Sequence, residues 1–96
     1  MRLRLTALFL MLLMSAARAA PAPQQVEIPL GSGILHAQLY KPEGEGPFPT
    51  VIALHACGGL GGHTDPVLPR YRDWTEELLK AGNAVLWPDS FGSREL

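Results

Sequence analysis

The sequence predicts an α/β fold, in which an edge β-hairpin is followed by a βαβ unit of parallel sheet. Residues 25–40 alternate apolar and polar side chains on both sides of a short glycine turn, a pattern typical of a half-exposed hairpin. Two continuous apolar runs, 50–54 and 84–87, suit strands that are buried on both faces. The stretch between these runs has a helical period. A length of 96 residues allows at most one small domain of this kind.

The first 19 residues have the pattern of a secretory signal peptide. Two arginines precede a ten-residue apolar core, Leu5–Met14, and small residues at positions 17 and 19 fit a signal-peptidase site. This core is shorter than the roughly 20 residues that a membrane span requires, so we expect cleavage after residue 19 and no stable membrane anchor. The mature chain would then be secreted or periplasmic, with residues 20–25 as a stiff spacer before the domain of residues 26–96.

The composition of the remaining chain excludes several classes of protein. All nine acidic residues but only five of the eight basic residues follow residue 19, and the basic residues are scattered. This distribution argues against a nucleic-acid partner. No apolar run of about 18 residues occurs there, so no membrane-spanning helix is expected. Cys57 is the one cysteine, which excludes an internal disulfide, and we expect it to be buried as a small apolar residue.

The predicted hairpin joins strands 25–30 and 34–40 through the turn residues Gly31–Gly33. Residues 41–49 contain three prolines and two glycines and are expected to form a loop. Thr50–Leu54 is rich in β-branched residues, which favours the first parallel strand.

The segment Tyr71–Ala81 is predicted to be an amphipathic helix. Its apolar side chains recur at spacings of three and four residues along one face: Tyr71, Trp74, Leu78 and Ala81. Gly82 and Asn83 then form a C-terminal stop. Ala84–Trp87 is expected to be the second parallel strand, ended by Pro88.

The glycine-rich stretch that begins at His55 fits no nucleotide-binding loop completely. It lacks the Gly-Lys-Ser/Thr of a P-loop, and a dinucleotide fingerprint starting at Gly59 has Thr64 where the third glycine belongs. The side chains of His55, Cys57 and His63 complete no known metal-ligand spacing, so we expect neither a metal nor a cofactor.

The same stretch also fails as a nucleophile elbow, because His55 stands two residues before Cys57 and a long loop follows. A glycine loop after a buried strand has a different use, since it can aim a peptide N–H at a developing oxyanion. Ligands of open parallel sheets bind beyond the carboxyl ends of the strands, which is where His55–Gly59 and Asp89–Arg94 are expected to lie.

The segments VIALHACGGLGG (51–62) and YRDWTEELLKAGNAVLWPDSFGSRE (71–95) resemble the dienelactone hydrolase family of the α/β-hydrolase superfamily. The resemblance covers residues 25–95, with Ala56 in place of the usual glycine and Ser93 in place of the usual proline. It implies that the chain is the N-terminal part of an α/β-hydrolase fold, incomplete at its C-terminal side. The implied activity is that of an exported hydrolase, which cleaves a small-molecule ester or lactone by acyl transfer.

By the same resemblance, the Cys57 N–H would be an oxyanion-hole donor. His55 would organise the loop beneath the substrate, and Arg94 would hold a substrate carboxylate, although an ordinary surface arginine fits the sequence equally well. No Gly-x-Ser-x-Gly motif with a following acid and histidine occurs, so we expect the chain to stop before its nucleophile. Two alternatives stay open: a nucleotide-binding βαβ domain, and a non-catalytic binding module on a hydrolase fold.

Overall fold

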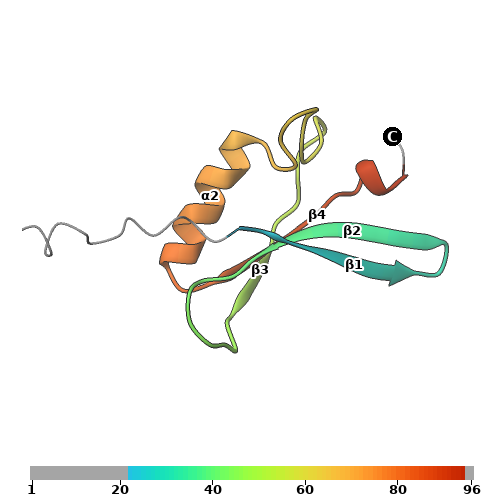
Figure 1. Ribbon diagram of the computed structural model, residues 1–96. Helices are drawn as coiled ribbons and strands as arrows, with labels where there is room; N and C mark the ends of the chain where they lie inside the picture. Colours follow the sequence, from blue (N-terminus) through green and yellow to red (C-terminus); the bar gives the residue numbers. More distant parts are fainter. Residues whose placement is uncertain (1–21, 95–96) are drawn as a thin grey trace, which may run out of the picture.

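The computed structural model describes residues 22–94, which form an α/β domain on a four-stranded sheet (Figure 1). Along the chain the elements are β1 (Gln24–Leu30), β2 (Gly33–Tyr40), β3 (Thr50–Ile52), α2 (Pro69–Lys80), β4 (Ala84–Pro88) and the 3-10 helix η1 (Gly92–Arg94). The strand order is β1-β2-β4-β3, with β2 antiparallel to both β1 and β4 and with β3 parallel to β4. The predicted fold class is therefore confirmed, whereas the predicted signal peptide lies outside the described residues.

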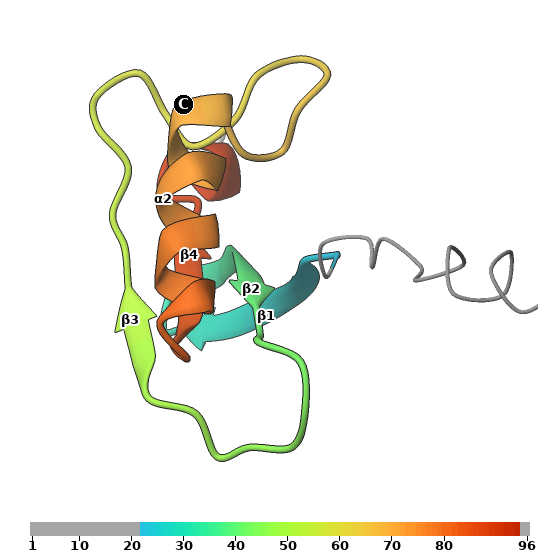
Figure 2. The same cartoon turned by 90° about the vertical axis from the view of Figure 1, so that its left-hand side faces the viewer.

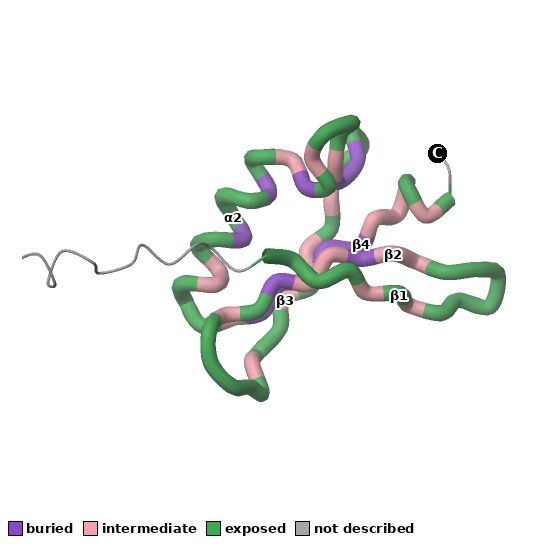
Figure 3. Tube along the Cα trace, viewed as in Figure 1, coloured by how far each residue is buried: buried purple, intermediate pink, exposed green. Residues whose placement is uncertain are grey.

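Strand β4 is the centre of the packed region, with β2 on one side and β3 on the other. Its Val85 and Trp87 side chains are buried and belong to the core beneath α2. Figure 2 shows the helix lying across β4, and Figure 3 shows buried segments in β4, in α2 and in the loop before α2. The core is completed by side chains from β2, the β3–α2 loop and α2: Tyr40, Leu60, Val67 and Tyr71.

Helix α2 begins two residues earlier than predicted, because Pro69 occupies its first turn, where a missing N–H breaks no helical bond. It ends at the predicted stop. Gly82 has a φ of 89°, its N–H donates to Leu79 O (2.9 Å), and the Asn83 N–H donates to Leu78 O (3.0 Å). This pair of bonds is a Schellman motif. Among residues 22–94, no helix has the length and apolarity that a membrane span requires.

The buried face of α2 differs from the predicted one. Tyr71 and Thr75 are buried, whereas Trp74 is 68% exposed and Ala81 is also exposed, so their assignment to the inner face is wrong. The reason is a pair of hydrogen bonds, which a pattern of apolar residues cannot reveal. The Trp87 indole N–H donates to Thr75 Oγ1 (2.8 Å), and the Thr75 hydroxyl donates to the Tyr71 carbonyl (2.7 Å).

Strand β3 is shorter and more exposed than predicted. Only residues 50–52 pair with β4, and Ile52 and Leu54 are 65% and 73% exposed, so the expected burial of residues 50–54 on both faces is wrong. The register explains this exposure, because Ile52 and Leu39 both lie beside Leu86, on the face opposite Val85 and α2. The single described helix covers one face of the sheet and leaves this second apolar face open.

The open face predicts self-association of a protein that consists of residues 20–96. Exposed apolar sheet faces and unpaired strand edges recruit other chains. Replacing Ile52 and Leu54 together by lysine should raise the monomeric fraction in sedimentation velocity. Trp74→Lys, which removes an equally exposed apolar side chain from α2, should change it much less. A wild-type monomer with a cooperative thermal transition would contradict this expectation.

The Thr75–Trp87 bond predicts a loss of stability in Thr75→Val. The substitution keeps the shape of the side chain but leaves the buried indole N–H without an acceptor, which costs roughly 1–3 kcal/mol. Urea denaturation of the wild-type and variant proteins measures the free energy of unfolding. Thr50→Val, at an exposed position, is the matched control. Equal stability of the two variants would show that the indole finds another acceptor.

Candidate active site

The loops that follow β3 and β4 meet at the carboxyl ends of these parallel strands, the edge at which open α/β sheets bind ligands. The first loop carries the predicted His55–Gly59 motif, and the second carries residues 89–94. A cleft of about 290 Å³ has Gly58–Gly62 on one side and Asp89, Phe91 and Gly92 on the other. The two segments that the sequence places beyond the strand ends are thus neighbours in space.

His55 ties the two loops together. Its Nδ1 lies 2.8 Å from the Ala56 carbonyl oxygen, and the Ser90 N–H donates to its Nε2 (3.2 Å). Nε2 accepts a hydrogen bond and Nδ1 faces an acceptor, so the neutral ring with its proton on Nδ1 satisfies both contacts. The Phe91 ring packs against it, with centroids 4.9 Å apart at an interplanar angle of 69°. Both ring nitrogens are engaged, so His55 has no nitrogen left to act as a general base.

Tyr71 holds the same turn from the helix. Its hydroxyl oxygen accepts the Ala56 N–H (2.9 Å) and a hydrogen bond from Arg70 Nη2 (3.2 Å). The bond from Ala56, aided by the hydrogen bond and charge of Arg70, lowers the pKa of the Tyr71 phenol, although burial opposes this shift. The Tyr71 ring lies 4.8 Å from the Trp87 ring, so packing in the core determines where the hydroxyl lies.

The turn between these anchors presents unpaired backbone donors. The Gly59 N–H donates to Ala56 O (3.0 Å) and closes the turn, in which Cys57 and Gly58 are exposed. Within residues 22–94, neither the Cys57 N–H nor the Gly58 N–H has a hydrogen-bond acceptor. Consecutive N–H groups of this kind are suited to binding an anionic oxygen. The expectation that Cys57 is buried is wrong, because its side chain is needed neither in the core nor in any contact that holds the turn.

The rest of the β3–α2 loop is anchored in the core. Leu60 and Val67 are each 1% exposed and pack with the buried residues of β4 and α2. Gly61 is required by a close approach of the backbone, since a Cβ there would lie 2.5 Å from the carbonyl oxygens of Asp65 and Pro66. The turn is therefore carried by a loop of fixed shape.

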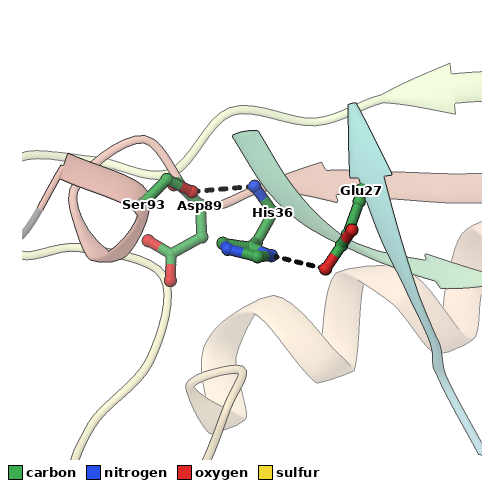
Figure 4. A network of polar contacts seen from close by, with 4 residues as sticks. All are labelled: Glu27, His36, Asp89 and Ser93. Atoms are coloured by element: carbon green, nitrogen blue, oxygen red, sulfur yellow. Dashed lines mark hydrogen bonds and ion pairs between the residues drawn. The ribbon is translucent and has the colours of Figure 1, made fainter. Parts of the chain in front are cut away.

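The loop after β4 is attached to the hairpin by a polar network (Figure 4). The His36 N–H donates to Ser93 Oγ (2.8 Å), the Ser93 hydroxyl donates to Asp89 O (2.7 Å), and the Asp89 N–H donates to His36 O (2.8 Å). The His36 ring faces Glu27, with Nδ1 4.0 Å from the carboxylate. Arg94 is exposed at the end of η1, and among the described residues its side chain has no ion-pair partner.

A larger groove of about 450 Å³ lies elsewhere in the domain. It is lined in part by Tyr40, Val67 and Leu79 and contains none of the residues that the sequence singles out. In the part of the chain that the structure describes, no three His, Cys, Asp or Glu side chains gather in a metal-binding arrangement. His63 is exposed in the β3–α2 loop, and the structure does not group it with His55 and Cys57.

Two residues of the site, Tyr71 and Arg70, were not predicted from the sequence, whereas Ser90 lies in the predicted segment Asp89–Arg94. The helical period assigns Tyr71 to the core, which is correct for its ring and says nothing of its hydroxyl. Ser90 takes part through its backbone N–H, which no side-chain pattern reveals. The available signal was the Arg-Tyr pair in the first turn of the helix that follows the glycine loop.

His55→Phe should loosen the contact between the two loops. Phenylalanine keeps a ring against Phe91 but removes both hydrogen bonds, each worth roughly 0.5–1.5 kcal/mol. The Ser90 amide hydrogen is then expected to exchange about 2- to 12-fold faster with solvent, as measured by NMR. His63→Phe, in the same loop, should leave this rate unchanged. An unaltered Ser90 rate in His55→Phe would mean that other contacts hold the loops together.

Comparisons of the chain with protein-family models, with curated proteins and with solved structures find no match. The function of the site is therefore inferred from the chemistry of its own residues.

Proposed function

We propose that this chain forms the oxyanion-binding side of a hydrolase active site, in an exported enzyme that cleaves a small ester or lactone by acyl transfer. The observation that carries the proposal is the pair of N–H groups of Cys57 and Gly58, which have no acceptor among the described residues and lie on a turn beyond the carboxyl end of β3. The resemblance of residues 51–62 and 71–95 to dienelactone hydrolases supports the same assignment.

Acyl transfer needs such donors, because attack on an ester carbonyl converts its oxygen into an oxyanion. Donors that are held in place before the reaction stabilise this charge without reorganising, and the loss of one donor typically lowers kcat about 100- to 1,000-fold. Here the turn is held on one side by His55 and on the other by Tyr71, through hydrogen bonds of 2.8 and 2.9 Å to Ala56. These contacts supply the preorganisation that an oxyanion hole requires.

The described side chains contain no nucleophile with a free base. Cys57 is the exposed thiol of the turn, but both ring nitrogens of His55 are engaged by Ala56 and Ser90. His55 therefore cannot accept a proton from the thiol. In the proposed enzyme the nucleophile, its acid and its histidine base lie outside residues 22–94, and Cys57 contributes its N–H.

The β3–α2 loop favours this function over a nucleotide-binding loop, because it lacks the Gly-Lys-Ser/Thr of a P-loop. The two acidic residues that line the cleft, Asp65 and Asp89, both have partners. Asp65 is paired with Arg72 (3.6 Å), and Asp89 accepts the Gly92 N–H (2.9 Å). Arg94 is the exposed cation of the loop after β4, and we propose it as the group that would bind a substrate carboxylate.

Two substitutions of Cys57 separate its N–H from its thiol. In the full-length protein, Cys57→Pro removes the N–H and should lower kcat for p-nitrophenyl acetate about 100- to 1,000-fold. Cys57→Ala keeps the N–H and should keep most of the turnover, as measured by p-nitrophenol release. Circular dichroism shows whether both variants fold.

Complete loss of turnover in a folded Cys57→Ala protein would assign the chemistry to the thiol and contradict the proposal. Absence of turnover in the wild-type protein, across a panel of esters and lactones, would support a non-catalytic binding module instead.

A further inference from the structure

Within residues 22–94, the hydrogen bonds of Tyr71 leave its hydroxyl hydrogen without an acceptor. The phenol oxygen accepts from the Ala56 N–H and from Arg70, and both of these groups can only donate. The O–H can therefore donate only to a third group. Among residues 22–94, no such acceptor is found. A side-chain donor thus remains available beside the Ala56–Gly59 turn.

We propose that the Tyr71 hydroxyl donates to the same substrate oxygen as the Cys57 N–H, and so forms a side-chain part of the oxyanion site. This inference rests on the proposed function. The Tyr71 hydroxyl oxygen accepts the N–H of Ala56, which is the residue directly before Cys57. Consecutive Cα atoms lie about 3.8 Å apart. The hydroxyl and the Cys57 N–H therefore belong to one small region. The hydroxyl hydrogen stays on Tyr71 throughout, because the contact is a hydrogen bond and no proton transfer is involved.

Arg70 makes this donor stronger and favours an anion beside it. Its guanidinium lies over the Tyr71 ring, 4.9 Å from the centroid, and its Nη2 bonds the hydroxyl. The same Nη2 would lie 3.8 Å from a Cβ at Gly58, so the cation is adjacent to the turn. A positive charge at this place attracts an oxyanion and polarises the phenol O–H.

Tyr71→Phe tests the proposal in the full-length protein, with Tyr40→Phe as the matched control. Tyr40 is the other tyrosine of the chain and is buried in the core as the last residue of β2, whereas Tyr71 bonds the turn at Ala56. For p-nitrophenyl acetate, Tyr71→Phe should lower kcat about 10- to 1,000-fold with little change in KM, because the donor acts on charge that develops in the transition state. Tyr40→Phe should stay within about twofold of wild type.

A pH profile separates hydrogen-bond donation by Tyr71 from its structural support of Ala56. The phenol donates only while protonated, so wild-type kcat should fall as the pH rises through the lowered pKa of Tyr71. This fall should be absent in Tyr71→Phe. The charged and titratable groups that act on the phenol are Arg70 on the same helix and the Cys57 thiol, while β4 presents the neutral Trp87. A fall in kcat that is caused by the Cys57 thiol would occur in both the wild type and Tyr71→Phe, which distinguishes it from a fall caused by Tyr71.

The outcomes distinguish failure of this inference from failure of the proposed function. Wild-type turnover with unchanged kinetics in Tyr71→Phe would overturn the role of Tyr71 and leave the hydrolase standing. A lower kcat in Tyr71→Phe without any change in the pH profile would also overturn donation, because it indicates structural support alone.

If the wild-type protein hydrolyses no ester, the proposed function fails, and binding of methylphosphonate decides the role of Tyr71. This tetrahedral anion should then shift the Cys57 and Gly58 amide signals in NMR, with affinity at least fivefold weaker in Tyr71→Phe than in Tyr40→Phe. Equal affinity in the two variants, or no shift of these amides in the wild type, would overturn the inference.

Discussion

The position of Tyr71 is the constraint on which the rest of the domain depends, because one side chain belongs to both the core and the site. Its ring packs against Trp87 of the central strand, and its carbonyl accepts the hydroxyl of Thr75, which in turn accepts the Trp87 indole N–H. Its own hydroxyl binds the backbone of Ala56. The packing of helix on sheet thereby sets the shape of a loop that has no regular structure of its own. A shift of the helix would be transmitted directly to the turn.

The two halves of the site are held in different ways. The turn after β3 depends on the hydrogen bond from Ala56 to Tyr71 of the helix and on buried loop residues such as Leu60. The loop after β4 depends on hydrogen bonds that join the backbone of His36 and Asp89 to each other and to the Ser93 hydroxyl, which attach it to the hairpin. His55 connects these two supports. The cleft therefore lies between one loop that is anchored in the hydrophobic core as well as by hydrogen bonds and another that is attached by hydrogen bonds, and these two kinds of contact respond differently to temperature and to solvent.

The fold could be predicted from the sequence because its patterns are local. Alternation, glycine turns and the helix stop each depend on neighbouring residues, and the hairpin and the end of α2 agree with prediction. The exposure of Ile52 and Trp74 could not be predicted, since it depends on which other elements are present to cover them. For the site, the segment containing His55 and Cys57 was identified from its position after a predicted buried strand, at the carboxyl end of the sheet. The role of Tyr71 was not, because it depends on one hydroxyl at the rim of a hydrophobic core.

The order of the strands has a consequence for how the chain folds as it is synthesised. β1 and β2 pair through a tight turn, whereas β3 and β4 pair only after helix α2 has crossed between them, and an isolated hairpin is marginally stable in water. Every other pairing requires β4, the last strand of the described chain. A nascent chain whose residue 88 has not yet left the ribosome therefore lacks β4, the strand that joins the hairpin to β3. The loops that must close when β4 pairs with β2 and β3 are long. Until β4 has left the ribosome, the turn that contains Cys57 lacks the central strand on which the rest of the domain packs.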